Sequence, residues 1–476
     1  MKKMMGHQRI RKNMAFYFLS KGVETLSAIA LLSLITRYLG HQSYGEYAFI
    51  MNLVFVFVPV VNFGLSNIMI RDIARDKVHS GEYFGAAMMC RTFLIFFCAV
   101  SLIIIAYQLP DISMLAVALA VISEFSLAYA RLCSDLYISF EKMKYDALLT
   151  ITNRSLNILG ICLIVIYDMG FAAIFACTAG VNISTLILGF GIVRRKLLVP
   201  KMTVQLASLK SLLKEALPIA FSSALNEILI RVDVFILKMY RDFSEIGLFD
   251  APLRLVLRIA TFSLAFVTSL LPIYSRLAHF SRGDLLYVYE KSFKVLFAFI
   301  LPVALFMSLF AQRICILLFG DQFRDSTVSL QFLAWVLFII FIDILVGHML
   351  ISLNKQNLIA LEFIVVFFLN LVLEMILVPR YGLSGAGLSK LIAFGIGFLM
   401  SFYFVRRSLG IISITSVVAK PLLSSLLMTG ALYMSREAGL PLLIVLGITV
   451  YGGGLWGLRV FSQQEVIKLK EILKTA

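Results

Sequence analysis

The sequence has little charge and few residues that carry out chemistry. Only 15% of its 476 residues are Asp, Glu, Lys or Arg, and it contains 5 His and 2 Trp. A soluble globular domain carries about 25% charged residues. The low charge argues against a soluble enzyme or a nucleic-acid-binding module. With 61% hydrophobic residues and a mean hydropathy of +0.94, the composition indicates an integral membrane protein.

Catalytic and metal-binding motifs are also missing. The sequence has no HExxH motif, no Gly-rich phosphate loop and no CxxC pair, and its six cysteines are scattered singly along apolar runs. We therefore expect no catalytic residue, no metal ligand and no cofactor, and we interpret the cysteines as small buried hydrophobic residues.

Apolar runs of membrane-spanning length predict an all-α polytopic membrane protein with about fourteen transmembrane helices. The runs cover residues 14–36, 44–66, 84–107, 113–139, 147–167, 170–193, 216–239, 248–275, 293–312, 327–352, 357–378, 383–404, 417–435 and 439–458. Twelve spans is the main alternative, because Lys420 weakens the thirteenth run and three consecutive glycines interrupt the fourteenth.

The basic residues predict the orientation. With a cytoplasmic N-terminus, the expected cytoplasmic segments hold about 28 of the 43 Lys and Arg residues and the external segments about 7, as the positive-inside rule requires. The formal charge of +16 thus favours a multi-pass protein with both termini in the cytoplasm over a protein that binds nucleic acid.

The chain contains an internal repeat. At an offset of 202 residues, SYGEYA at 43–48 aligns with EIGLFD at 245–250 and Gly45 with Gly247; at 213, ISFEKMK at 138–144 aligns with ISLNKQN at 351–357, and Asn157 with Asn370. An offset of 212 aligns Gly170 with Gly382. Since each repeat would hold six helices, the two halves should be related by an axis along the membrane normal.

The repeat predicts four parts of the chain. They are an N-terminal six-helix lobe at 1–193, a basic cytoplasmic linker at 194–215, a C-terminal six-helix lobe at 216–405, and two additional helices with a basic tail at 406–476. In a transporter of this kind the substrate site lies near the midplane at the repeat interface.

Two turns give the chain a family resemblance. RYLGHQSYGEYAF at 37–49 and VPRYGLSGAGLSK at 378–390, with the repeated six-helix lobe, resemble the polysaccharide flippases of the multidrug, oligosaccharidyl-lipid and polysaccharide exporter superfamily. The resemblance implies a flippase in the bacterial cytoplasmic (inner) membrane that moves an undecaprenyl-diphosphate-linked oligosaccharide repeat unit to the external leaflet by alternating access. Such a protein serves the assembly of O-antigen and lipopolysaccharide, capsule or exopolysaccharide.

The resemblance also implies partners. They are the polyprenyl-diphosphate-linked oligosaccharide, membrane lipid, a coupling ion that is either a proton or sodium, and the polymerase and chain-length proteins of the same pathway. Two transport alternatives stay open, an ion-coupled multidrug exporter and a lipid II flippase. An enzyme acting on the same lipid-linked sugars is disfavoured, because the longest expected external connection, 313–326, is short.

Ionisable residues within the predicted spans are the candidate site, because a charge at the bilayer centre costs about 2.5–3.5 kcal/mol and should line a wet cavity or be paired. We expect substrate contacts from cationic residues, since the arginine fork matches phosphate oxygens: Arg254, Arg258, Arg154, Arg131, Arg231, Lys21 and Lys390. We expect ion coupling from buried carboxylates: Glu24, Glu124, Asp135, Glu227 and Asp233.

Spacing leaves a structural alternative for most of these residues. Arg131 and Asp135 are four apart, as are Asp250 and Arg254 and also Glu227 and Arg231, so each pair could be an ion pair within one helix. Arg154 has no acid within one turn of its own helix, which favours a substrate contact. Arg91, near a helix end, is expected to extend toward the interface, and Asp343 and His348 are expected to make structural polar contacts.

Overall fold

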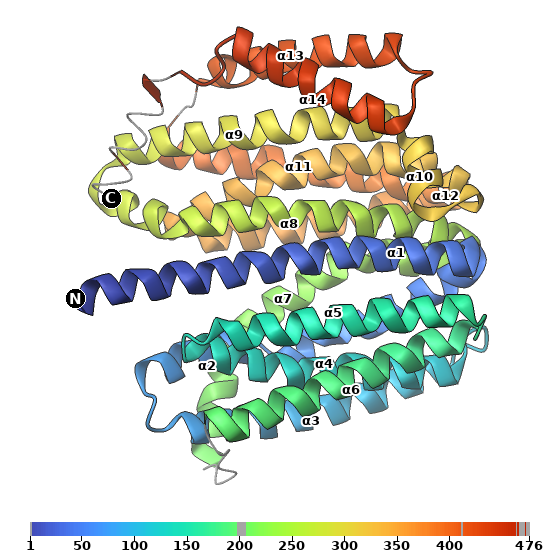
Figure 1. The fold of residues 1–476 in the computed structure, drawn as a ribbon, viewed down its shortest axis with the longest axis vertical. Helices are drawn as coiled ribbons and strands as arrows, with labels where there is room; N and C mark the ends of the chain where they lie inside the picture. The colour runs from blue at the N-terminus through green and yellow to red at the C-terminus, as the bar shows by residue number, and fades with distance from the viewer. Residues whose placement is uncertain (1, 198–205, 411–412, 463, 466–471, 473–476) are drawn as a thin grey trace. The chain divides into compact units, whose positions relative to one another are not determined.

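A computed structural model describes the backbone of residues 2–197, 206–410, 413–462, 464–465 and 472, and the side chains of most of these from residue 22 onward. Fourteen α-helices and one short 3-10 helix form this part of the chain, and it contains no strand (Figure 1). The expected all-α membrane fold is confirmed. Eleven helices are long and apolar enough to cross a membrane by length and composition.

Two glycines separate pairs of predicted spans. α1 (Lys2–Asn62) holds the first predicted span and most of the second, and it kinks between them at Gly40, whose φ of 68° and ψ of 173° are not helical. α12 (Gln356–Leu409) holds the eleventh and twelfth spans and kinks at Gly382, with φ 55° and ψ −132°. Glycine adopts positive φ without steric cost, so the chain leaves the helical conformation there and changes direction between the two spans.

Two short helices were not predicted. α2 (Leu65–Arg75) and α10 (Ala311–Phe319) lie in segments expected to be connections, and α10 leads into the 3-10 helix Asp321–Ser326. Both are too short to span a membrane, and a search for long apolar runs therefore misses them.

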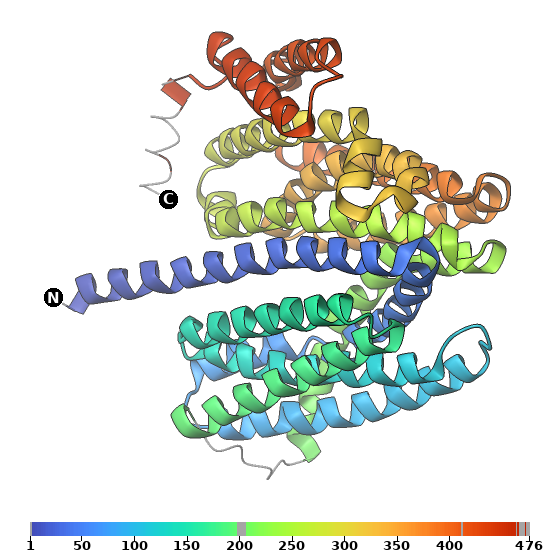
Figure 2. The ribbon, with the colours of Figure 1, turned by 45° about the vertical axis from the view of Figure 1, so that its right-hand side comes forward.

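The other helices follow the predicted spans. They are α3 (Ser80–Tyr107), α4 (Met114–Ser139), α5 (Met143–Ile166), α6 (Phe171–Lys196), α7 (Leu206–Tyr240), α8 (Phe243–Phe280), α9 (Arg282–Leu309), α11 (Thr327–Ser352), α13 (Ile414–Met434) and α14 (Leu440–Gly457). α13 and α14 pair as a hairpin (Figures 1 and 2).

The chain divides into two compact units. One unit comprises Met1–Lys238 with Asp242–Gly247, and the other comprises Met239–Arg241 with Leu248–Ala476. α7 begins the second sequence repeat but belongs to the first unit. The repeat and the compact unit are therefore different divisions of the chain, and the two six-helix lobes stay a prediction.

The backbone agrees with the sequence repeat at its turns. Glu141 and Asn354, which the repeat aligns, both have left-handed φ, at 55° and 58°. The next amide closes each turn alike: Lys142 N donates to Tyr137 O at 2.8 Å, and Lys355 N to Leu350 O at 2.9 Å. Aligned Gly170 and Gly382 also have positive φ. Matched sequences therefore form matched connections.

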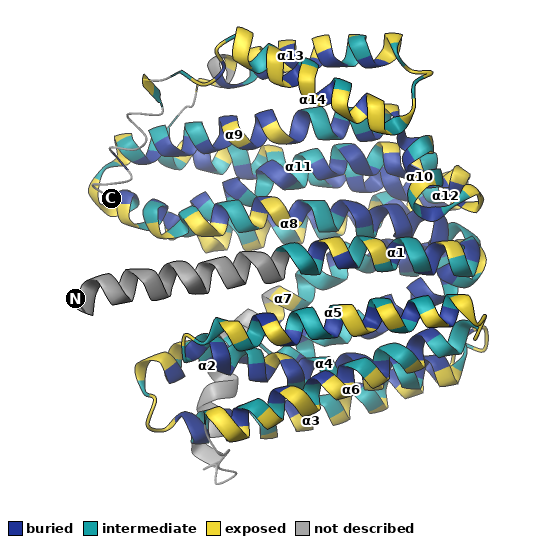
Figure 3. Cartoon of the chain, in the orientation of Figure 1, coloured by how far each residue is buried: buried dark blue, intermediate teal, exposed yellow. Residues whose placement is uncertain are grey.

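Exposed apolar residues recur along the helices, as expected where lipid covers the surface. Figure 3 shows exposed positions recurring along α3, α6, α13 and α14. On α3 the exposed fractions of Phe93, Phe96 and Phe97 are 71%, 70% and 61%. Hydrocarbon tails would cover such side chains in a bilayer, so their exposure fits a membrane protein.

Candidate functional site

A polar contact of the first unit joins α7 to α1. Arg231 Nε donates to Glu227 Oε1 at 2.6 Å, one turn earlier on α7, and Arg231 Nη1 donates to Asn52 Oδ1 on α1 at 2.5 Å. The guanidinium also lies over the Phe55 ring, 4.4 Å from its centroid. The side chain of Arg231 is still 18% exposed. The predicted Glu227–Arg231 pair is confirmed, and Asn52 is a partner that spacing could not identify.

Arg154 on α5 is paired across helices. Its Nη2 lies 3.4 Å from Glu24 Oε1 on α1, with the two side chains 23% and 26% exposed. Arg154 has no acid within one turn of its own helix, as the sequence states, but an acid of another helix pairs with it. The pair joins a predicted substrate residue to a predicted ion-coupling residue, so a change at either one alters the charge state around the other.

An amide network lies beside Arg154 and connects α4, α5 and α6. Asn153 Nδ2 donates to Asn182 Oδ1 at 2.9 Å and to Thr185 Oγ1 at 3.0 Å. Asn182 Nδ2 donates in turn to Ser123 Oγ at 2.9 Å. These residues are buried, and Ser123 precedes the buried Glu124. The network fixes the helices that carry Arg154 and Glu124, and sequence spacing did not reveal it.

Arg131 and Asp135, four residues apart on α4, lie in two different environments. Arg131 is exposed, whereas Asp135 receives a hydrogen bond from Ser66 and interacts electrostatically with Arg91. Among the described residues no ion pair joins Arg131 to Asp135. Arg91 does not extend toward the interface as expected: it is fully buried, and its Nη1 donates to Ala128 O on α4.

In the second unit, α8 carries the predicted arginines. Arg254 Nε donates to Asp250 Oδ2 at 2.5 Å, and the Arg254 side chain remains 23% exposed while Asp250 is 2% exposed. Arg258 lies one further turn along α8 and is half-buried. The predicted structural pair of Asp250 and Arg254 is thus present, and the Arg254 side chain is only partly enclosed.

Carboxylates of the second unit meet in its interior. Asp343 on α11 and Glu362 on α12 share a hydrogen bond, and Ser401 Oγ, beyond the kink of α12, donates to Glu362 Oε2. His348 Nδ1 instead lies 2.8 Å from Ile344 O, so Asp343 and His348 do make structural contacts but with different partners. Two carboxyl groups can share a hydrogen bond only when one is protonated.

Lys390 and Asn370 lie elsewhere on α12. Lys390 is 1% exposed, and its Nζ lies 5.3 Å from the centroid of the Phe394 ring. Asn370 Nδ2 donates to Glu374 Oε1 at 2.7 Å. A cation this deeply buried is better suited to holding helices together than to meeting a large substrate.

Two predicted residues give less information. Asp233 on α7 is fully buried. Lys21 lies outside the residues whose side chains the structure describes.

Three paired arginines lie well inside their helices. At a rise of about 1.5 Å per residue, Arg231 lies about 14 Å from the end of α7 at Tyr240, and Arg154 and Arg254 lie about 17 Å from the starts of α5 and α8. Each guanidinium is next to a carboxylate that keeps it charged, and each side chain is partly exposed.

Comparison with known proteins places this geometry in a family. Residues 10–278 match the family model described as polysaccharide biosynthesis protein. The chain is 23% identical over 412 residues to a capsular polysaccharide biosynthesis protein, CapF, of Staphylococcus aureus, covering 83% of this chain and 99% of that protein. It is 21% identical to a putative O-antigen transporter of Shigella flexneri, covering 80% and 94%.

Solved structures share the fold. A lipid II flippase, MurJ, in an inward closed conformation superposes with a TM-score of 0.75 at 17% identity, covering 93% of this chain and 97% of that one. An inward-facing multidrug resistance transporter of the MOP superfamily gives a TM-score of 0.62 at 18% identity, covering 81% and 95%. The family model spans more than half of the chain, and the chain therefore belongs to the polysaccharide biosynthesis protein family.

Proposed function

We propose that the protein is a flippase that moves an undecaprenyl-diphosphate-linked oligosaccharide repeat unit from the cytoplasmic to the external leaflet by alternating access. Its relatives support a role in polysaccharide assembly. They include a capsular polysaccharide biosynthesis protein and a putative O-antigen transporter. A probable glycan biosynthesis flippase of Haloferax volcanii matches about half of this chain. In this role the protein moves its substrate without catalysing a chemical reaction on it.

The observation that carries the proposal is a set of arginines inside the long helices that are paired yet partly exposed. Arg154, Arg231 and Arg254 each keep between 18% and 23% of the side chain accessible. A guanidinium presents five N–H donors in a planar fork whose geometry matches the oxygens of a diphosphate. A diphosphate cannot cross hydrocarbon without such compensating charge.

The mechanism follows from where the charges lie. The diphosphate exchanges water for arginine N–H groups in the middle of the membrane, and the sugars pass through polar surroundings while the polyprenyl chain stays in lipid. Because the carboxylates Glu24, Glu227 and Asp250 already hold the arginines, the diphosphate competes with them for the same donors. Such competition keeps binding reversible, which transport requires. We further propose that a proton or sodium ion drives the step through these carboxylates.

The test measures where lipid-linked repeat units lie in cells. In a strain lacking the gene, external accessibility of the sugars is compared in intact and lysed cells. The strain is complemented by wild type, Arg254→Gln, Arg258→Gln or the control Arg324→Gln, which changes an exposed arginine of the 3-10 helix Asp321–Ser326. In cells that carry Arg254→Gln or Arg258→Gln, we expect complete units to accumulate on the cytoplasmic face while the protein level stays normal. Wild-type transport in both would overturn the assignment.

The same strain separates the two alternatives. Normal surface polysaccharide with lost drug resistance would indicate a multidrug exporter instead. Accumulation of lipid II on the cytoplasmic face, with unchanged repeat units, would indicate a lipid II flippase.

A further inference from the structure

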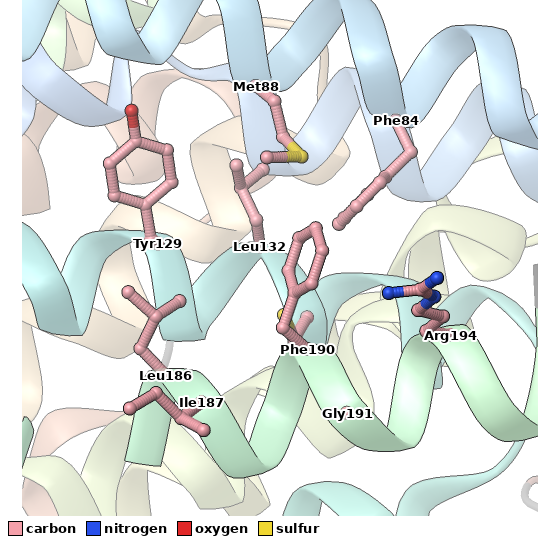
Figure 4. Close-up of a pocket in the computed structure, with 10 residues that line it drawn as sticks. Phe84, Met88, Tyr129, Leu132, Leu186, Ile187, Phe190, Gly191 and Arg194 are labelled. Carbon is pink, nitrogen blue, oxygen red and sulfur yellow. The ribbon is translucent and has the colours of Figure 1, made fainter. Parts of the chain in front are cut away.

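A cavity of about 500 Å³ lies within the first unit, among α3, α4 and α6 (Figure 4). Its volume falls within the range of about 300–1,000 Å³ found for small-molecule sites. None of the candidate arginines described above lines it. Its walls are formed mainly by apolar and aromatic side chains, including Phe84, Met88, Tyr129, Leu132 and Phe190.

The wall on α6 is open and in part unfilled. Ile187, which lines the cavity, is 66% exposed, and a Cβ atom added at Gly191 would meet no other atom within 4 Å. In a bilayer these exposed apolar surfaces face hydrocarbon. An apolar space that opens toward hydrocarbon favours an apolar chain over water, because water there would lack hydrogen-bond partners.

One end of the cavity is cationic. Arg194 is the charged residue in its lining, and the Figure 4 close-up shows its side chain beside Phe190 and Gly191. Arg195 and Lys196 follow in the last turn of α6. Lys142, on the turn between α4 and α5, donates from Nζ to Lys196 O at 3.3 Å and adds another cation. In the part of the chain that the structure describes, no carboxylate pairs with Arg194.

We propose that this cavity binds an anionic membrane phospholipid, with one acyl chain along the apolar walls and the phosphate on Arg194. An arginine fork binds phosphate oxygens through charge-assisted hydrogen bonds. Basic pockets between membrane helices are typical sites for anionic lipid headgroups. Arg154, Arg231 and Arg254 do not line the cavity, so the lipid acts as a bound cofactor of the folded unit and not as cargo.

A lipid in this position bridges three helices. α4 carries Glu124 and contacts the network that orients Arg154, and α6 contributes Asn182 and Thr185 to that network. A ligand that binds only the folded state stabilises it in proportion to its concentration and affinity. We therefore expect anionic phospholipid to raise the thermal stability of the purified protein.

The test uses the purified full-length protein and two probes with identical acyl chains, phosphatidylglycerol and phosphatidylcholine. Lipid binding is measured by native mass spectrometry, and unfolding temperature is measured with each lipid. We expect wild type to bind phosphatidylglycerol more tightly than phosphatidylcholine. Arg194→Gln should bind phosphatidylglycerol about fivefold more weakly than wild type does, which is the effect of one basic contact. Phosphatidylcholine binding should not change in this variant.

Cavity filling gives the second arm. Gly191→Leu should weaken binding of both lipids, because its side chain occupies the space of the acyl chain. The matched controls are Arg195→Gln, a neighbouring cation that does not line the cavity, and Gly180→Leu, an exposed α6 glycine with equally open surroundings. Both controls should bind as wild type does.

Three results would overturn the proposal. They are equal wild-type affinity for the two lipids, unchanged binding in Gly191→Leu, and displacement of phosphatidylglycerol by an undecaprenyl phosphate at lower concentration, which would make the cavity a site for the substrate tail. The readouts use no glycan substrate, so failure here leaves the flippase assignment to its own test.

Discussion

Gly45 and Gly247 are in close contact, and the segment that carries each glycine leaves no room for a side chain on the other. A Cβ atom at Gly45 would lie 1.7 Å from Phe243 O and 3.1 Å from Gly247 N; one at Gly247 would lie 2.1 Å from His41 O and 3.0 Å from Gly45 N. Residues 41 and 243 are aligned by the same offset as the two glycines. The contact is therefore reciprocal, as a local two-fold relation between repeats would produce.

This contact predicts that neither glycine can be replaced by alanine. Because the obstructing atoms are backbone, the segments must move apart, and overpacking typically costs about 1–3 kcal/mol. We expect Gly45→Ala and Gly247→Ala each to lower the unfolding temperature of the detergent-purified protein. Gly180→Ala is the control, since its added Cβ meets nothing within 4 Å and alanine favours a helix. Equal stability of all three variants would contradict the close packing.

The turn at Asn354 makes a second prediction. Its φ of 58° is tolerated by asparagine and glycine but strained for alanine. Asn354→Ala should cost about 1 kcal/mol, whereas Asn354→Gly should cost little. Thermal unfolding of both variants measures this difference, with Gln356→Ala, at the start of α12, as a nearby control. A loss in the glycine variant equal to that in the alanine variant would show that the side chain, and not the backbone, stabilises the turn.

Sequence patterns identified what is local or repeated in this protein. They identified the apolar spans, the aligned pair Gly45 and Gly247, and the i, i+4 contacts of Arg231 and Arg254. They also divided α1 and α12 into separate spans, and Gly40 and Gly382 do interrupt the helical conformation between those spans.

Partners on other helices could not be predicted from spacing. Glu24 is 130 residues from Arg154 along the chain, and Glu362 reaches Asp343 from a different helix. Helical periodicity states which residues share a face but not which face meets it. Arg154, which has no acid within one turn of its own helix, is therefore paired with an acid of another helix. Arg91, which was expected near a helix end, is buried between α3 and α4.

We expect the contact between Glu465 and the lysines of α9 to weaken in acid. Glu465 Oε1 lies 2.7 Å from Lys291 Nζ, and its Oε2 lies 3.0 Å from Lys294 Nζ, both on α9. Burial alone would raise the pKa of Glu465, but the hydrogen bonds from the two lysines outweigh this effect and lower the pKa to about 2. Since the folded pKa lies below the unfolded value of about 4.3, the contact stabilises fully above that value and is lost as the pH falls toward 2.

Limited proteolysis of the C-terminal segment between pH 6 and pH 3 measures this effect. Wild type should be better protected than Glu465→Gln at pH 6, and the difference should shrink toward pH 3. Glu437→Gln, which removes a carboxylate that is 90% exposed, should match wild type at every pH. A constant difference between wild type and Glu465→Gln across the range would contradict the assigned ionisation.

The Arg154–Glu24 pair separates a structural from a transport role. Glu24→Gln leaves the partly buried guanidinium of Arg154 with less negative charge around it, so this substitution should destabilise the protein. Adding Arg154→Gln should recover part of the loss, giving a coupling free energy of about 0.5–3 kcal/mol in a double-mutant cycle. Lys238 and Asp111, 3.0 Å apart with Asp111 67% exposed, are the control pair and should couple by less than about 1 kcal/mol.

Transport by the same variants decides what Arg154 contributes. If its N–H groups hold the diphosphate, the double variant regains stability but stays inactive, because glutamine cannot supply a charged fork. If the pair only holds α5 to α1, activity returns with stability. The measurement is external accessibility of the lipid-linked sugars in cells that carry each variant at equal protein level. We expect the inactive double variant, and an active one would remove Arg154 from the substrate site.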